Sequence, residues 1–156
     1  MRLFIMRHGP AEEESSSGRD FDRQLSASGR RRTTAAAGEL RRRGEEPELI
    51  LSSPLVRAVQ TAGLVAAVFG GARTDVRDEL APSEDAFALV QELLLGPAAS
   101  VLVVSHAPDV SILAERLLAE SGRRVGAFSP ATIAAIELAG GRATSLFTLD
   151  AAALTP

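Results

Sequence analysis

The sequence predicts an α/β fold with a largely parallel central sheet, helices on both faces and a C-terminal antiparallel hairpin. Residues 1–156 are expected to form a single three-layer domain. Short apolar runs alternate along the chain with segments of helical period, which is the order of repeated strand–helix units. The apolar runs are continuous, as expected for parallel strands buried on both faces. The last segment instead holds two strand-like runs joined at Gly140-Gly141, which indicates a hairpin.

The first half of the chain is expected to form two units, each a buried strand followed by a helix. Each strand is a short apolar run that ends at glycine, proline or serine. Each helix has a stripe of apolar or small residues, a serine before its first turn and a glycine after its last. The polar stretch after the first strand has no period and predicts a mobile surface loop. In order, these are a strand at 3–6, a loop at 11–25, a helix at 26–43, a strand at 49–51, and a helix from Pro54 to residue 69.

The second half continues the alternation and then changes period. A short strand is expected after the glycine pair that ends the second helix, and a third helix follows it. The clearest buried strand of the chain comes next and ends at a His-Ala-Pro break before a fourth helix. In order, these are a strand at 74–77, a helix at 83–95, a strand at 100–104, a helix from about 108 to about 120, and hairpin strands at 132–138 and 143–149.

The composition excludes several kinds of chemistry. There is no cysteine, which excludes disulfides, thiolate zinc sites and cysteine nucleophiles. All 17 basic residues are arginine, so a P-loop lysine and a Schiff-base lysine are excluded as well. The two histidines come without an H-E-x-x-H pattern, so we expect no metal site, and nothing in the sequence indicates a cofactor.

Charge and hydropathy narrow the set of partners. The net charge is −3 and the pI is about 5.4, which argues against binding of nucleic acid by a basic face. The longest apolar runs are far shorter than the roughly 20 residues that span a bilayer, so no membrane partner is expected. The first six residues are too short for a signal-peptide core. We therefore expect a cytoplasmic enzyme or binding domain.

Two histidines and two arginines follow predicted strands. His8 and His106 each come directly after a buried parallel strand, and Arg7 lies beside the first of them. Arg57 lies in the first turn of the helix that follows the second strand. Because the carboxyl ends of parallel strands meet at one edge of a sheet, these side chains are expected to form one site. Guanidinium groups match phosphate oxygens, so the sequence predicts a phosphate-binding site at this edge.

This anion site fits either binding alone or catalysis. A neutral histidine can attack phosphorus and form a phosphohistidine, which divides one difficult displacement into two easier ones. The arginines and the second histidine would then stabilise the charge on the phosphoryl oxygens. The nearby positive charges are expected to lower the pKa of His8 and to keep it neutral near pH 7.

Four segments carry a resemblance to a known family. Arg7-His8-Gly9, directly after the first strand, is similar to the signature of the histidine phosphatase superfamily, the phosphoglycerate-mutase-like group. Three later segments resemble the family's other motifs and occur in the family's order, so that the resemblance covers residue 2 to about residue 115. These segments are Arg23 to Gly29, Ser52 to Ala62, and Val101 to His106.

The resemblance implies a role for each predicted site residue. It implies His8 as the phosphorylated nucleophile, with Arg7, Arg57 and His106 completing the phosphate pocket. Arg23 would be a further contact to the phosphate or the substrate. Because the arginines and His106 already supply positive charge, we expect activity without a metal ion.

Many members of the family also carry an acid that protonates the leaving group. Glu79 is the best positional match for this acid, and a solvated loop carboxylate is the alternative interpretation. Asp78, Glu84 and Asp85 lie close enough in the sequence to take the same role.

The length of the chain favours one branch of the superfamily. The resemblance implies that mutases and phytases carry long insertions over the pocket, whereas only about 20 residues separate Glu79 from the last parallel strand. The chain looks most like the short SixA-like phosphohistidine phosphatases, which implies a phosphorylated protein such as a histidine-phosphotransfer domain as substrate. Two alternatives stay open: a phosphatase of small phosphate monoesters, and a non-catalytic module that binds phosphate or a partner.

Overall fold

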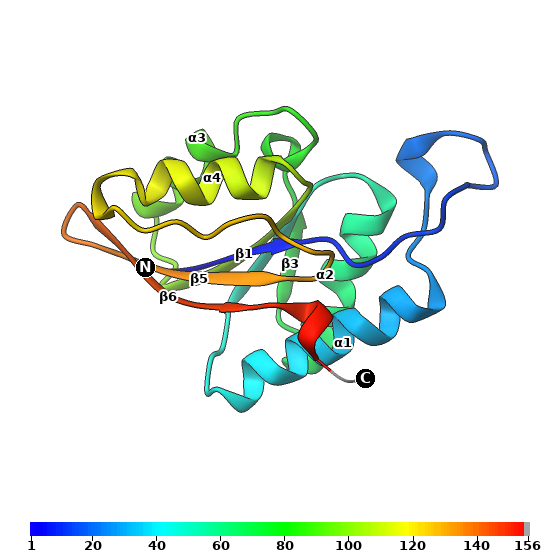
Figure 1. Cartoon of the computed structure of the whole chain (residues 1–156), viewed down its shortest axis with the longest axis horizontal. Coiled ribbons are helices and arrows are strands. Elements are labelled where there is room, and N and C mark those ends of the chain that lie inside the picture. Colours follow the sequence, from blue (N-terminus) through cyan, green and yellow to red (C-terminus); the bar gives the residue numbers. More distant parts are fainter. Residues whose placement is uncertain (155–156) are drawn as a thin grey trace.

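Six strands form one sheet in the computed structural model, which describes residues 1–154 (Figure 1). The strand order is β3-β2-β4-β1-β5-β6. Strands β3, β2, β4 and β1 are parallel to one another, and β5 runs antiparallel to both β1 and β6. The predicted fold class, including the hairpin, is confirmed. The strands are β1 (Arg2–Arg7), β2 (Leu49–Ser52), β3 (Arg73–Val76), β4 (Ser100–Ser105), β5 (Ile133–Ala139) and β6 (Arg142–Leu149).

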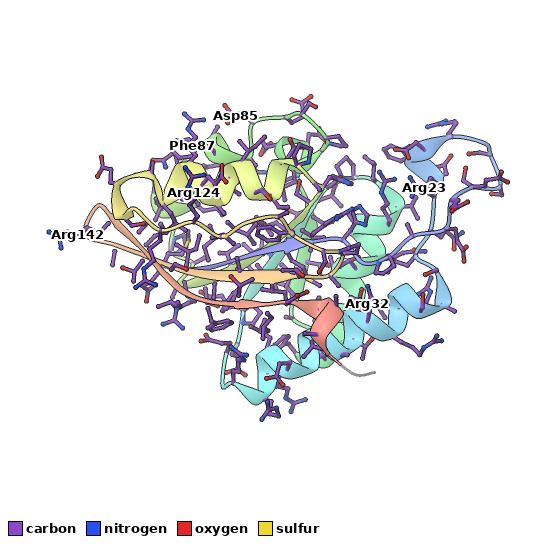
Figure 2. All side chains as sticks on the ribbon, in the orientation of Figure 1. Arg23, Arg32, Asp85, Phe87, Arg124 and Arg142 are labelled. Atoms are coloured by element: carbon purple, nitrogen blue, oxygen red, sulfur yellow. The ribbon has the colours of Figure 1, made fainter. Side chains whose placement is uncertain are left out.

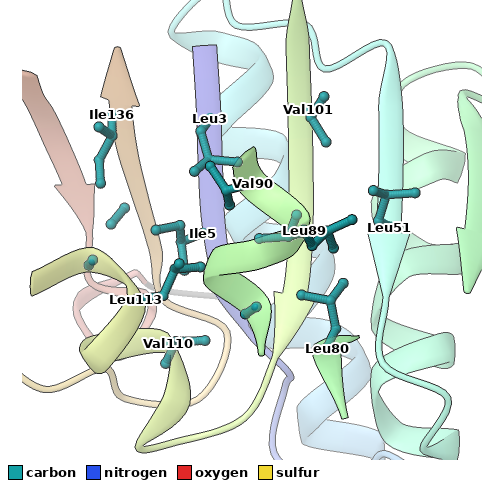
Figure 3. Close-up of a cluster of buried hydrophobic side chains, with 14 of the residues drawn as sticks. Leu3, Ile5, Leu51, Leu80, Leu89, Val90, Val101, Val110, Leu113 and Ile136 are labelled. Carbon is teal, nitrogen blue, oxygen red and sulfur yellow. The ribbon is translucent and has the colours of Figure 1, made fainter. Parts of the chain in front are cut away.

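Helices cover both faces of the sheet, because the central parallel strands are apolar on both sides. Phe4 belongs to the core cluster under α1 and α2, whereas its neighbour Ile5 belongs to the cluster under α3 and α4. Figure 3 shows the second cluster, in which Leu89 of α3 and Leu113 of α4 lie near Ile5. The helices are α1 (Ala27–Arg42), α2 (Val56–Val68), α3 (Ala86–Leu94) and α4 (Asp109–Leu117).

Two helices begin later than the sequence pattern predicted. Helix α2 begins at Val56 rather than at Pro54. The cause is the Ser53 hydroxyl, which accepts a hydrogen bond from the backbone N–H of Leu55 (3.2 Å) and forms a turn before the helix. Helix α3 begins three residues later than predicted, because the side chain of Asp85 accepts from a backbone N–H of its first turn and caps it.

The segment 11–25 is irregular, in agreement with the predicted loop, while its mobility stays a prediction. It contains one turn of 3-10 helix, η1 (Asp20–Asp22), and in Figure 1 it extends outward between β1 and α1. A second such turn, η2 (Asp78–Leu80), follows β3. Each turn carries an acidic residue that bears on the site. Asp20 of η1 lies beside the predicted site residue Arg57, and Glu79 of η2 is the predicted acid.

Two glycines bring the chain after β1 directly against α1. A Cβ at Gly29 would lie 1.9 Å from the carbonyl oxygen of Pro10, and a Cβ at Gly9 would lie 2.3 Å from Oγ1 of Thr33. Neither position accepts a side chain unless the backbone or a buried group moves. Ser26 caps α1 at this contact, since its side chain accepts from the N–H of Gly29 (2.9 Å). The close approach therefore fixes the path of the chain that follows His8.

Candidate active site

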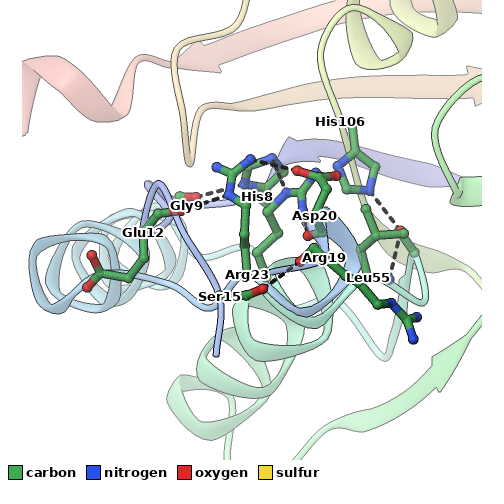
Figure 4. Close-up of polar contacts among 11 residues, drawn as sticks. His8, Gly9, Glu12, Ser15, Arg19, Asp20, Arg23, Leu55 and His106 are labelled. Carbon is green, nitrogen blue, oxygen red and sulfur yellow. Dashed lines mark hydrogen bonds and ion pairs between the residues drawn. The ribbon is translucent and has the colours of Figure 1, made fainter. Parts of the chain in front are cut away.

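The two histidines lie side by side at the carboxyl edge of the sheet. Strands β1 and β4 are neighbours in parallel register, so the residues that follow them, His8 and His106, come together. Their ring centroids are 5.1 Å apart and their planes are tilted by 58°. Arg57, the second residue of α2, reaches the same place from the helix after β2, and Figure 4 shows the cluster. His8, Arg57 and His106 are only 8%, 7% and 4% exposed.

The hydrogen bonds of His8 define which ring nitrogen is free to react. Its Nδ1 lies 2.7 Å from the carbonyl oxygen of Gly9, and a carbonyl can only accept, so Nδ1 carries the proton. Nε2 then holds the lone pair and accepts from Nε–H of Arg57 at 3.3 Å. The nitrogen that holds the lone pair thus faces a guanidinium, a group that can bind phosphate oxygens.

Both histidines are neutral at physiological pH. Burial lowers the pKa of His8 to about 4, and the charges of His106, Arg57 and Arg7 act in the same direction, against the hydrogen bond to Gly9. Burial likewise lowers the pKa of His106 to about 4, helped by the charges of Arg57 and Arg7. We predicted that positive charges would keep His8 neutral; the larger cause is its removal from water.

Arg7 lies close enough to both histidines for its charge to affect them. Its Nη1 donates to the carbonyl oxygen of Phe128 (2.8 Å), which holds the guanidinium in place. Its Nε is buried and has no hydrogen-bond partner within residues 1–154. Burial also lowers the pKa of Arg7. An unpaired N–H at a site of this charge is a donor available to an anion.

Asp20 of η1 links Arg57 to Arg23. Its Oδ2 accepts from Nη2 of Arg57 (3.1 Å), and its Oδ1 accepts from Nη1 of Arg23 (2.8 Å). Its backbone carbonyl also accepts from Nη1 of Arg57 (2.9 Å). The hydrogen bond from Arg23, followed by that from Arg57, lowers the pKa of Asp20, so the bridging group is a carboxylate. Arg23 therefore joins the site through a carboxylate rather than by contact with a histidine.

The predicted acid lies in a different set of contacts. Glu79 Oε2 is 2.7 Å from Nη2 of Arg77, an ion pair without hydrogen-bond geometry. Arg77 also pairs with Glu92 of α3 (2.8 Å). Within residues 1–154, the recorded hydrogen bonds and ion pairs of Glu79 include none to the histidine–arginine cluster. Of the alternative acids, Asp85 is engaged as the cap of α3, and Asp78 and Glu84 are exposed.

Three residues beside the site were not among the predicted ones. Asp20 was part of an irregular loop, and no sequence rule relates a loop carboxylate to an arginine that lies in a later helix. Ser53 was interpreted as part of a helix start, but its hydroxyl lies 2.8 Å from Nε2 of His106. Thr61 accepts from the N–H of Gly9 (3.1 Å) and donates to the carbonyl of Arg57 (2.7 Å), which ties α2 to the chain after His8. Ser53 and Thr61 both lie in the segment Ser52 to Ala62. The resemblance of this segment to a motif of the family was the signal that could have identified them.

A groove of about 770 Å³ lies elsewhere on the molecule, between α3, α4 and the turn of the β5–β6 hairpin. Its lining includes Phe87 and Arg142, which Figure 2 places toward the end opposite Arg23. Neither histidine lines this groove. The candidate active site is therefore identified by its side chains and not by the volume of a cavity. Within residues 1–154 no three histidine, aspartate or glutamate side chains gather as a metal-ligand set, and no helix has the length and apolar character needed to cross a membrane.

The structure is an α/β domain with two histidines and an arginine clustered at the carboxyl edge of its sheet, and comparison with known proteins gives the family. The model of the histidine phosphatase superfamily (branch 1) matches residues 3–82. The phosphohistidine phosphatase SixA of Escherichia coli is 34% identical over 142 residues, which cover 88% of this chain and 86% of SixA. The chain belongs to the histidine phosphatase superfamily.

Two further similarities extend over most of the chain. An uncharacterised protein of Picosynechococcus sp. is 38% identical over 120 residues, which cover 75% of this chain and 73% of that protein. A solved structure of the protein histidine phosphatase SixA complexed with tungstate has a TM-score of 0.87 and 32% identity, over 97% of this chain and 98% of that one. The similarity therefore extends beyond the four motifs to nearly the whole fold.

Proposed function

We propose that this phosphatase removes the phosphoryl group from phosphohistidine in a protein, through a phosphohistidine intermediate on His8. The observation that carries the proposal is the unprotonated Nε2 of His8, whose lone pair faces Arg57 in a buried site where both histidines are neutral. A neutral imidazole with a fixed tautomer is a nucleophile that needs no base to activate it.

In the first step, Nε2 of His8 forms a bond to phosphorus while the bond from phosphorus to the substrate imidazole nitrogen breaks. The electron pair of the broken bond goes to the leaving imidazole, which takes a proton from water. In the second step, the oxygen of a second water attacks phosphorus and the electron pair of the bond to Nε2 returns to that nitrogen. Phosphate leaves as hydrogen phosphate, and the other proton of this water neutralises the hydroxide that the first step produced. The products are the free histidine of the substrate and the unchanged enzyme.

The arginines and His106 hold the phosphoryl group in both steps. Before the phosphate arrives, Arg57 donates its Nε–H to Nε2 of His8, so the two must separate for the attack to occur. The N–H that is released can donate to a phosphoryl oxygen, as can the unpaired Nε–H of Arg7. These fixed charges supply what a magnesium ion provides in other phosphoryl-transfer sites, and we expect turnover without metal.

A protein substrate is supported by the extent of the match and by the leaving group. The chain and the tungstate-bound SixA cover almost all of each other, so this chain adds no capping insertion relative to that phosphatase. Tungstate, like phosphate, is an oxyanion. An imidazole leaves phosphorus more easily than an alkoxide does, so it needs less help from an acid. This agrees with the position of Glu79, the acid candidate, which pairs with Arg77 and not with the site.

The test is a comparison of substrates with one preparation of the protein. Turnover is measured on a phosphorylated histidine-transfer domain, on free phosphohistidine and on a panel of phosphate monoesters, each with and without chelator. We expect kcat/KM to be highest on the phosphorylated protein and unchanged by chelator. Higher kcat/KM on a monoester would assign the small-ester activity instead. Binding of phosphate without turnover on any substrate would assign the non-catalytic module.

A further inference from the structure

The hydroxyl of Ser53 contacts His106, the second histidine of the site. Ser53 follows β2 and is completely buried, and its Oγ lies 2.8 Å from Nε2 of His106. We propose that Ser53 is a positioning residue that keeps the proton of neutral His106 on Nδ1, so that Nδ1–H donates to the phosphoryl group. This inference rests on the proposed function for its last step only.

The direction of the hydrogen bond follows from the other contacts of Ser53. Its oxygen already accepts from the N–H of Leu55 (3.2 Å), and the recorded hydrogen bonds within residues 1–154 give the hydroxyl hydrogen no acceptor other than Nε2 of His106. In the reverse direction, with His106 as the donor, two buried groups would be left unpaired, the hydroxyl hydrogen of Ser53 and the lone pair on Nδ1 of His106, whereas in this direction only the Nδ1–H of His106 is. Such a loss opposes folding. The hydroxyl therefore donates, and Nε2 of His106 accepts.

The second nitrogen of His106 must then carry the proton. Nδ1 is buried and has no hydrogen-bond partner within residues 1–154, although the side chain as a whole is only 4% exposed. Buried N–H groups are rarely left unpaired in folded proteins. The phosphoryl group would bind to the neighbouring ring of His8, whose centroid lies 5.1 Å from that of His106. The oxygens of the phosphoryl group would then supply the missing acceptor.

The two histidines thus have the same tautomer and opposite roles. In His8 the protonated Nδ1 is occupied by the carbonyl of Gly9, and the nitrogen that remains has a lone pair. In His106 the unprotonated Nε2 is occupied by Ser53, and the nitrogen that remains has a proton. One ring is set as nucleophile and the other as donor, each by a single neighbouring group.

The first test reads the tautomer directly by nitrogen NMR of the imidazoles, which is simple because the chain has 2 histidines. In the wild-type protein near pH 7, we expect His106 to have a protonated Nδ1 and an unprotonated Nε2. Ser53→Ala should move the proton of His106 partly to Nε2, and Ser53→Thr, which keeps the hydroxyl, should restore the wild-type pattern. A wild-type His106 protonated at Nε2 would overturn the proposal without any variant.

The matched control is Ser105→Ala. Ser105 precedes His106 and is also buried, but its hydroxyl donates to the carbonyl of Leu80 (2.8 Å) and does not contact the ring. It should leave the tautomer of His106 unchanged.

The second test measures inhibition by orthovanadate. Ser53→Ala should weaken it about ten-fold, which corresponds to ~1.4 kcal/mol, and Ser105→Ala less than two-fold. A Ser53→Ala protein that keeps both the tautomer and the vanadate affinity would contradict the proposal. Failure of the proposed function would instead appear as no turnover on any substrate, and it would leave the tautomer result intact.

Discussion

The two sides of the active site are built differently. On the buried side, His8, Arg57 and His106 are each less than a tenth exposed and contact one another or the backbone of the sheet edge. On the exposed side, which we predict that substrate and leaving group approach, Asp20 has a side chain that is 63% exposed and Glu79 one that is 33% exposed, and both lie on single 3-10 turns. The lone-pair nitrogen of His8 is held by core packing, whereas Asp20 and Glu79 lie on surface turns.

This difference separates what the fold must hold rigidly from what can vary. Buried groups held by packing and by hydrogen bonds to neighbouring groups keep one position, which is what attack on phosphorus needs. The Asp20 and Glu79 carboxylates lie on surface turns, where their side chains are partly in contact with water. Substitutions on the first side should therefore affect chemistry, and those on the second should affect which substrate is used.

The largest expected effect comes from removal of the nucleophile. His8→Ala should lower turnover by about four orders of magnitude or more, because it removes the covalent path itself. The measurement is kcat on a phosphohistidine protein, with circular dichroism and thermal unfolding to show that the fold survives. A variant that retains a tenth of the wild-type rate would mean that another group attacks phosphorus. Label transferred from a phosphorylated donor should appear on the wild-type chain and not on the variant.

A smaller and selective effect is expected from Glu79→Gln, on the exposed side. An alkoxide needs a proton as it leaves, and a positioned acid contributes about 10²–10⁴-fold, whereas imidazole needs little help. We expect a loss below about ten-fold on phosphohistidine and above about a hundred-fold on any monoester that the enzyme hydrolyses. The matched control is Glu92→Gln, since Glu92 pairs with the same Arg77. A hundred-fold loss on phosphohistidine would show that the acid is essential there too.

The smallest expected effect is on the free energy of unfolding, through its dependence on pH at the buried side of the site. Burial lowers the pKa of His106 to about 4, against an ordinary value near 6.5, so between these values the unfolded chain binds more protons than the folded one. Stability is then full above pH 6.5 and is lost as the pH falls toward 4. From pH 7 to pH 5 this histidine should account for about 2 kcal/mol of that loss.

Urea unfolding of the wild type and His106→Gln at both pH values checks this prediction. The variant should lose less free energy of unfolding on acidification than the wild type. Equal losses in the two proteins would mean that His106 is not buried as a neutral ring.

The sequence predicted the buried side of the site better than the exposed side, for a physical reason. His8, His106 and Arg57 follow buried strands, and the topology of a parallel sheet brings such positions together whatever the loops do. The tautomer that we propose for His106 was not predictable, because it depends on the hydroxyl of a residue that follows another strand. The bridge from Asp20 to Arg57 and Arg23 was not predictable either, since a loop without period gives no register.

The close contact of Gly29 with Pro10 has a consequence for how variants of this protein will be interpreted. A side chain at Gly29 cannot be accommodated unless the chain after His8 moves, so damage to α1 reaches the reacting nitrogen through the backbone. In a screen of random variants scored by activity, such a substitution would rank with losses of the nucleophile although residue 29 touches no substrate. Inactivity at this position reports a displaced scaffold, and a measurement of folded-state stability beside activity would tell the two apart.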